Sequence, residues 1–289
     1  MEPIRADERK MPAFEARRSM SRAAAARSQG RLLLAACLLA LAPALAAAAP
    51  VAPEFSLTSQ DLGALTTDLP GSIRQAILAN PRGFLHQLAR VLDQPQDLLV
   101  LVDKSHLLGA DYVPPDLVPL GGYRLAVSRN DLSLRRVIMT DVLAMVAAAK
   151  AHGVILLFSS SYRSYEYQRE VYAREVKMYG QEAADRESAH AGASQHQLGT
   201  AIDFGSITDE FAGTRAGRWL AAHAWEYGFT LSYPKGYEQV TGYRWESWHY
   251  RYITRPAARL QREFFGDVQQ YLLEFLDAHR AQLQGARSK

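Results

Sequence analysis

The stretch from Ser194 to Asp203, Ser-Gln-His-Gln-Leu-Gly-Thr-Ala-Ile-Asp, constrains the fold more than any other part of the chain. It places an imidazole, His196, and a carboxylate, Asp203, close together in the sequence, with Gly199 between them. A glycine lets the backbone pass tightly between two such side chains. We therefore expect His196 and Asp203 to face the same point in the folded protein.

A second polar group follows downstream, in Trp245-Glu246-Ser247-Trp248-His249-Tyr250. A catalytic zinc ion takes three ligands from His and Asp/Glu and leaves a fourth position for water, whose pKa it lowers towards about 7. His196, Asp203 and His249 would supply this ligand set. Glu246 lies three positions before His249, close enough to act as the base that takes a proton from the water.

Each of these side chains also has a simpler interpretation. A histidine on a polar loop is often only solvated, an aspartate can cap a turn, and the aromatic residues around Glu246 suit a core. The set also matches the ligands of the two-histidine, one-carboxylate iron triad, but there the first histidine and the acid usually lie one residue apart. Among the other histidines, His190 is the only competitor, because it lies near His196 in a polar stretch.

The N-terminal region has the pattern of a secretory signal peptide. An apolar, alanine-rich run over residues 32–49 follows several arginines and ends in small residues. Residues 1–49 hold eight Lys/Arg and four Asp/Glu of the 33 and 30 in the chain, which leaves 25 basic and 26 acidic residues elsewhere. The rest of the chain therefore has no basic excess that would favour nucleic-acid binding, and no other run is long enough to span a membrane.

The details of this leader stay open. Cys37, the single cysteine, lies in a segment whose composition resembles a lipoprotein cleavage box, so lipidation is an alternative to simple cleavage. An uncleaved anchor is another alternative, and the long basic region suggests a start at Met20. Once the leader is removed, the protein has no cysteine and needs no disulfide.

The remaining residues predict a mixture of helices and strands. Asn80-Pro81 is typical of a helix start, and Gly153, Gly180 and Gly228 of helix ends. Residues 181–193 are expected to form a loop. We predict a helix that begins at Pro81 and has Phe84, Leu85, Leu88 and Leu92 on one face. Further helices are expected over residues 131–153, 165–179, 216–227 and 256–284, and strands over residues 154–158, 198–204, 229–233 and 245–253.

Three motifs in this order resemble the D-alanyl-D-alanine carboxypeptidases of vancomycin-resistance type. They are Ser161-Tyr162-Arg163-Ser164 with Gln168, the stretch from Ser194 to Asp203, and Glu246-x-x-His249. This zinc-peptidase group also contains D,D-dipeptidases, L-alanyl-D-glutamate endolysins and the hedgehog signalling domain. The resemblance covers roughly residues 98–255.

The resemblance implies an α+β fold, in which a small antiparallel sheet carries the metal site between flanking helices. Added to the residue pattern, it gives four segments: a signal peptide (1–49), a helical lead-in (50–95), the zinc peptidase domain (96–255) and a C-terminal helix packed on the domain (256–289). The oligomeric state is not indicated by the sequence.

The resemblance also implies the roles of the site residues. One zinc ion would be bound by His196, Asp203 and His249, with Glu246 as the base. Arg163 would steady the substrate carbonyl or its oxyanion, Gln168 would orient the substrate or the arginine, and Ser194 would bind near the terminal carboxylate of the substrate. Three departures are Gln195, where the family often has glutamate, Ser247, where it commonly has proline, and Ser160-Ser161, where glycine usually follows serine.

These residues favour a secreted zinc D,D-carboxypeptidase that removes the terminal D-alanine from peptidoglycan stem peptides, in the periplasm or at the cell wall. A D,D-dipeptidase or a peptidoglycan endopeptidase of the same family is an alternative, because loops such as 181–193 and 206–216 would decide the specificity. A module that binds the cell wall without catalysis is an alternative from another class.

Overall fold

The structure is a computed structural model that describes residues 48–288. The predicted signal peptide lies almost wholly outside this range, as do Cys37 and Met20. Within residues 48–288, no helix combines the length and the apolar character needed to cross a membrane.

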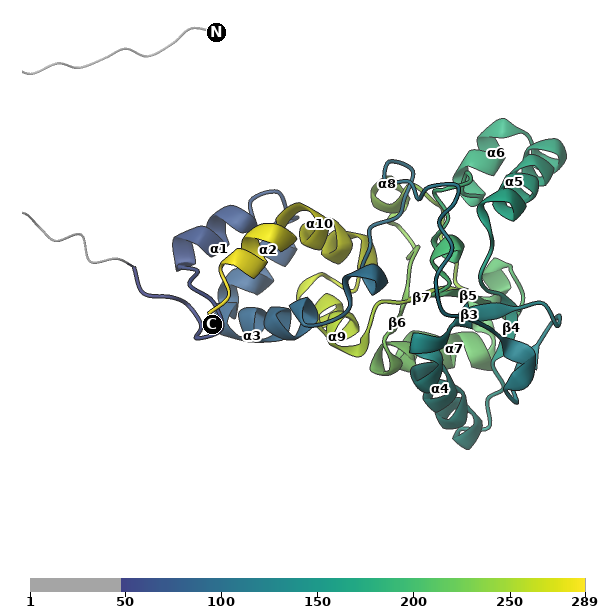
Figure 1. Ribbon diagram of the computed structural model, residues 1–289, viewed down its shortest axis with the longest axis horizontal. Coiled ribbons are helices and arrows are strands. Elements are labelled where there is room, and N and C mark those ends of the chain that lie inside the picture. Colours follow the sequence, from purple (N-terminus) through teal and green to yellow (C-terminus); the bar gives the residue numbers. More distant parts are fainter. Residues whose placement is uncertain (1–47, 289) are drawn as a thin grey trace, which may run out of the picture. The chain divides into compact units, whose positions relative to one another are not determined.

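The chain alternates between helices and short strands (Figure 1). The helices are α1 (Ser59–Leu65), α2 (Gly71–Ala79), α3 (Pro81–Leu92), α4 (Met139–Ala151), α5 (Tyr165–Tyr179), α6 (Gln181–Glu187), α7 (Arg215–His223), α8 (Glu238–Thr241), α9 (Arg255–Phe264) and α10 (Gln269–Gly285). The strands are β1 (Leu117–Pro119), β2 (Ala126–Val127), β3 (Ser133–Arg135), β4 (Leu157–Ser160), β5 (Ala201–Phe204), β6 (Phe229–Leu231) and β7 (His249–Tyr252).

The strands form two sheets. β1 and β3 pair antiparallel, and the larger sheet has the strand order β2-β4-β5-β7-β6. All its pairs are antiparallel except β2 with β4, which is parallel. The predicted α+β class is therefore confirmed, with the difference that the sheet carrying the candidate site is mixed.

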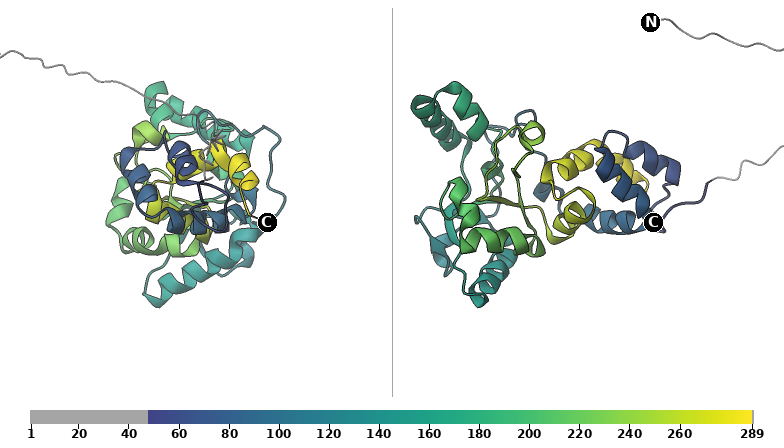
Figure 2. Two further views of the ribbon diagram at one scale, coloured as in Figure 1. Left: turned by 90° about the vertical axis from the view of Figure 1, so that its left-hand side faces the viewer. Right: turned by 180° about the vertical axis from the view of Figure 1, so that it is seen from behind.

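The apolar side chains form two cores. One lies around the larger sheet and includes residues of β4 to β7, α4 and α7, such as Phe158, Phe204 and Phe229. The other includes side chains of α1, α2, α3, α9 and α10, such as Phe84 and Phe264. The lead-in and the C-terminal helices thus share one core. We call these helices, α1 to α3 with α9 and α10, the helical unit (Figures 1 and 2).

The predicted helix over residues 131–153 is wrong in its first part. Residues 133–135 form β3, and the helix α4 begins only at Met139. Leu134 pairs with Val118 of β1 and is fully buried, so tertiary pairing outweighs the helical spacing of the apolar residues. The strand predicted at 154–158 is also displaced, because β4 begins at Leu157.

Other boundaries differ from the prediction as well. The strands predicted over residues 198–204 and 245–253 begin only at Ala201 and His249. Residues 181–187 of the expected loop form the helix α6, which packs on α5 and projects with it from the sheet (Figure 2). The expected C-terminal helix is divided into α9 and α10. Gly266 and Asp267 both have positive φ between them, a conformation that a continuous right-handed helix excludes.

Candidate metal centre and cleft

The sheet register places two of the site residues side by side. β5 and β7 are antiparallel neighbours, and Asp203 lies directly opposite His249. The side chains of directly opposite residues emerge on the same face of a sheet, with their Cβ atoms about 4.5–5.5 Å apart. The pairing of these two strands is therefore what joins the Ser194–Asp203 stretch to the downstream motif.

The third residue, His196, enters from the short 3-10 helix Gln195–Leu198 that precedes β5. Ser194 caps this helix, and its hydroxyl accepts a hydrogen bond from the His196 backbone N–H. The helix ends at Gly199, which has φ 67°, and the chain then turns into β5. This turn brings the His196 ring back beside Asp203.

Gly199 is a site where an added methyl group should be costly. A Cβ atom there would lie 3.0 Å from side-chain carbons of both Arg135 and Leu117, in addition to the strain of positive φ. We expect Gly199→Ala to lower the free energy of unfolding by about 1–2 kcal/mol or more, measured by urea denaturation. Gly213→Ala is the matched control, because that position has no neighbour within 4 Å and no positive φ; an equal loss in both variants would contradict this explanation.

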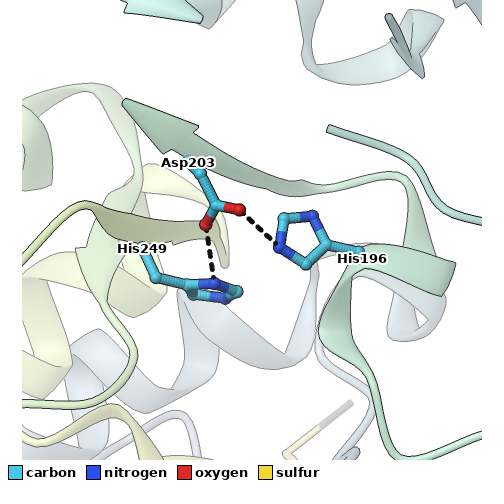
Figure 3. Close-up of side chains that lie close together, drawn as sticks. All are labelled: His196, Asp203 and His249. Carbon is cyan, nitrogen blue, oxygen red and sulfur yellow. Dashed lines mark ion pairs between the residues drawn. The ribbon is translucent and has the colours of Figure 1, made fainter. Parts of the chain in front are cut away.

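The rings of His196 and His249 and the Asp203 carboxylate point toward one another (Figure 3). His196 Nε2 lies 3.2 Å from Asp203 Oδ2, and His249 Nδ1 lies 3.0 Å from Asp203 Oδ1. The ligand atoms of all three lie within 4.8 Å of one another, and the residues are only 2–4% exposed. In the described part of the chain, this is the group of His, Cys, Asp and Glu side chains arranged to hold a metal ion.

The hydrogen bonding of this group suits a cation. His196 Nε2 and Asp203 Oδ1 are buried and lack a hydrogen-bond partner among the described residues, although they lie close to the other site atoms. Buried polar atoms without partners are costly in a folded protein. A divalent ion bound by the three side chains would satisfy these atoms, so the residues present fit the predicted zinc.

The protonation of the group also suits metal binding. His196 Nδ1 lies 2.7 Å from the backbone carbonyl oxygen of Ser161, which can only accept, so the N–H is on Nδ1 and the lone pair is on Nε2. Burial, assisted by the nearby Arg163 cation, lowers the pKa of His196 to about 4. Burial opposes ionisation of Asp203, but the two histidines outweigh it and hold its pKa well below the usual range.

Glu246 lies at the edge of the group. Its Oε2 is 3.5 Å from His249 Nδ1, and its backbone N–H donates to the carbonyl of Tyr233. Burial, and then the charge of Asp203, raise the pKa of the Glu246 carboxyl well above its usual range, whereas Arg163 and Arg244 lower it. A carboxyl group with a raised pKa is suited to accept and release a proton near neutral pH.

Arg163 lies beside the group formed by His196, Asp203 and His249. It follows β4, and its Nη2 lies 3.3 Å from Asp203 Oδ2 while its Nη1 donates to Gln168 Oε1 at 2.9 Å. Gln168 in turn donates to the backbone carbonyl of Ala189 at 2.7 Å. The Nε of Arg163 is buried and has no hydrogen-bond partner within residues 48–288.

A cleft and a smaller cavity meet at Arg163 and Glu246. The cleft has a volume of about 390 Å³ and includes Tyr167, Arg244 and Trp248 in its lining. The cavity has a volume of about 50 Å³ and is lined in part by Gln168, Ser194, Tyr233, Tyr243 and His249. Ser194 therefore both caps the short helix and faces the cavity.

The sequence reasoning assigned no role to several of these residues. Tyr243, whose buried hydroxyl has no partner in the described chain, lies in the Thr241-Gly242-Tyr243 segment. Arg244 directly precedes the Trp245–Tyr250 stretch. Their closeness to Glu246 in the sequence is the one indication that could have identified them. His190, the competing histidine, lies instead 3.1 Å from Asp185 in a separate, exposed group.

The fold and the site together define a peptidase-type domain with a possible metal site of three residues. Residues 131–255 match the family model described as VanY, D-alanyl-D-alanine carboxypeptidase. The chain therefore carries a domain of the VanY D-alanyl-D-alanine carboxypeptidase family, as the motifs predicted.

Individual relatives and structures agree with this assignment. YodJ of Bacillus subtilis (strain 168) is 34% identical over 176 residues, which are 58% of this chain and 64% of YodJ. The solved structure of the LdcB LD-carboxypeptidase has a TM-score of 0.56 and 32% identity, and the match covers 64% of this chain and 88% of that one. A vancomycin-resistance D,D-pentapeptidase VanY in complex with Zn(II) has a TM-score of 0.53 and 28% identity, with 61% and 99% covered.

The similarity does not extend over the full length of the curated relatives. The chain spans 64% of YodJ, and 58% and 45% of two further curated relatives. The helices α1 to α3 and α10 lie outside the residues that match the family model.

Proposed function

We propose that this protein is a zinc-dependent D,D-carboxypeptidase that removes the terminal D-alanine from peptidoglycan stem peptides. The observation that carries the proposal is the buried group of His196, Asp203 and His249 beside Glu246 and Arg163, in a domain of the VanY family. A divalent ion held by the three side chains would lower the pKa of water and polarise the peptide carbonyl.

The other side chains would then carry out the hydrolysis. Glu246 takes a proton from the attacking water, whose oxygen bonds to the carbonyl carbon of the peptide. Arg163 donates to the carbonyl oxygen as it gains negative charge. When the carbon–nitrogen bond breaks, Glu246 passes the proton to the leaving amine of D-alanine.

The two spaces around the site support an enzyme that removes one small residue. The cavity of about 50 Å³ suits a single small terminal residue, with Ser194 as the proposed contact near its carboxylate and Gln168 as the residue that orients Arg163. The cleft of about 390 Å³ on the other side suits the remaining stem peptide. A secreted protein, periplasmic or associated with the cell wall, follows from such a substrate.

A second candidate is an L,D-carboxypeptidase, which is favoured by the likeness to the LdcB structure. It would use the same residues on a stem peptide that has already lost one D-alanine. The D,D-dipeptidase and endopeptidase activities of the wider family are further outcomes of the same test.

We expect the purified protein to release D-alanine from a pentapeptide ending in D-Ala-D-Ala, and expect a chelator to abolish this release until zinc is restored. A panel with a tetrapeptide ending in one D-alanine, the dipeptide D-Ala-D-Ala and a cross-linked muropeptide separates the alternatives, with products identified by mass spectrometry. Equal release with and without chelator would reject metal catalysis, and release from the tetrapeptide alone would favour the second candidate.

A further inference from the structure

His249 differs from His196 in the nitrogen that faces Asp203. His196 presents Nε2, whereas His249 presents Nδ1. A neutral imidazole has a lone pair on only one nitrogen, so His249 can bind a cation through Nδ1 only when its proton is on Nε2. The Nε2–H group then needs a hydrogen-bond acceptor. For His196 the acceptor is a backbone carbonyl, whereas for His249 the described residues supply a side chain.

The group in contact with His249 Nε2 is the side chain of Gln195. The distance from Nε2 to Gln195 Oε1 is 3.2 Å, and the same oxygen accepts a hydrogen bond of 2.7 Å from the Ser232 hydroxyl. Gln195 and Ser232 are nearly fully buried, so water does not replace either of these two contacts. Gln195 could not accept a hydrogen bond from His249 if its side-chain amide were rotated by 180°, because its NH2 group would then face His249 Nε2.

A second amide, that of Gln269 in α10, sets the orientation of Gln195. Gln269 Nε2 donates to Thr230 Oγ1 at 2.7 Å and lies 3.5 Å from the Thr230 carbonyl oxygen, which can only accept. The Oε1 atom of Gln269 therefore faces Gln195, 3.4 Å from its Nε2. With its NH2 group on Gln269, Gln195 presents its oxygen to His249.

We propose that Gln195 is a positioning residue of the metal centre, which holds His249 in the tautomer that binds through Nδ1, and that Gln269 of the C-terminal helix holds Gln195. This inference rests on the proposed function insofar as it takes the three side chains to bind zinc. It adds that α10, which lies outside the part of the chain that matches the family model, is connected to the metal centre. Partners that orient a metal-binding histidine typically contribute about 10–100-fold to metal affinity.

The test is the zinc affinity of the full-length protein, measured by competition with a chromophoric chelator. We expect Gln195→Leu, which removes the acceptor, to weaken zinc binding about 10–100-fold. Gln195→Glu should recover much of the binding, because one carboxylate oxygen can accept from both His249 and Ser232, although the other oxygen cannot donate to Gln269 Oε1 as the amide does. Gln261→Leu is the matched control: Gln261 is equally buried but belongs to the helical unit, and its side chain contacts Asp267.

Gln269→Leu should also weaken zinc binding, but by a smaller factor than Gln195→Leu. Because Gln269 acts through Gln195, we expect the double variant Gln195→Leu/Gln269→Leu to bind zinc no more weakly than Gln195→Leu alone. The visible spectrum of the cobalt-substituted protein should change in Gln195→Leu and not in Gln261→Leu, which a general loss of stability would not produce. Thermal unfolding of the metal-free variants identifies any that fail to fold.

The possible failures can be told apart. Wild-type affinity in Gln195→Leu, or an equal loss in Gln195→Glu, would overturn the role of Gln195 while leaving zinc binding intact. A wild-type protein that binds no zinc would instead refute the metal centre and the proposed function together.

Discussion

Replacing Glu246 with glutamine is expected to lower kcat for peptide hydrolysis by about 10²–10⁴-fold while leaving zinc bound. The amide has nearly the same shape as the carboxylate but cannot accept a proton from water. The three side chains proposed to bind the metal are unchanged. Because burial and the charge of Asp203 already disfavour the ionised Glu246, an uncharged amide should not lower the free energy of unfolding.

The measurement is D-alanine release from a D-Ala-D-Ala-ended peptide, with zinc determined in the same samples. Glu246→Asp retains a carboxylate on a shorter side chain and should recover part of the activity. Unchanged kcat in Glu246→Gln would remove Glu246 from the chemistry. If the wild-type protein shows no turnover and both proteins bind peptidoglycan equally, the domain is a wall-binding module without catalysis.

The sequence predicts the class of fold and several elements well. The helix α5 occupies the predicted residues 165–179 and ends at Gly180, which has a positive φ of 86° that a residue without a Cβ atom adopts at little steric cost. The start of α3 is also confirmed, with the Asn80 side chain accepting from the backbone N–H of Gly83. In both cases the determining interactions are local, so they can be read from neighbouring residues.

Predictions are wrong where distant contacts decide the structure. The apolar spacing of Leu134 fits a helix, but pairing with β1 places this residue in β3. The polar composition of residues 181–187 suggested a loop, yet these residues form α6, whose Arg186 makes two hydrogen bonds with Glu238 of α8. Neither the partner strand nor the partner helix is evident from the local sequence.

The candidate site shows the same division. The sequence indicated which side chains gather, and the structure brings His196, Asp203 and His249 together, although their roles stay predictions. The sequence did not indicate that the two histidines present different nitrogens to Asp203. It also did not indicate that Gln195 contacts His249 and that Gln269 contacts Gln195. Those features depend on hydrogen bonds across the sheet and to α10, which no short motif specifies.

Arg163→Ala is expected to lower kcat by about 10²–10³-fold with a smaller effect on KM, because its guanidinium would stabilise charge that develops only as water attacks. Its position supports this expectation. The Arg163 side chain borders both the cleft and the smaller cavity, so it lies where the two would share a bound peptide. The Gln168 contact limits its movement, so the donors would already be placed before the substrate arrives.

Arg163→Lys separates charge from shape. Lysine keeps the cation but not the planar fork that can hold an oxygen through two parallel N–H groups, so we expect only partial recovery of kcat. Arg169→Ala is the control, since Arg169 lies on α5 with its side chain 65% exposed and paired with Glu166. Steady-state kinetics of the three variants decide the matter: a rise in KM at unchanged kcat would show that Arg163 binds the peptide equally in the ground and transition states, and the oxyanion role would then be wrong.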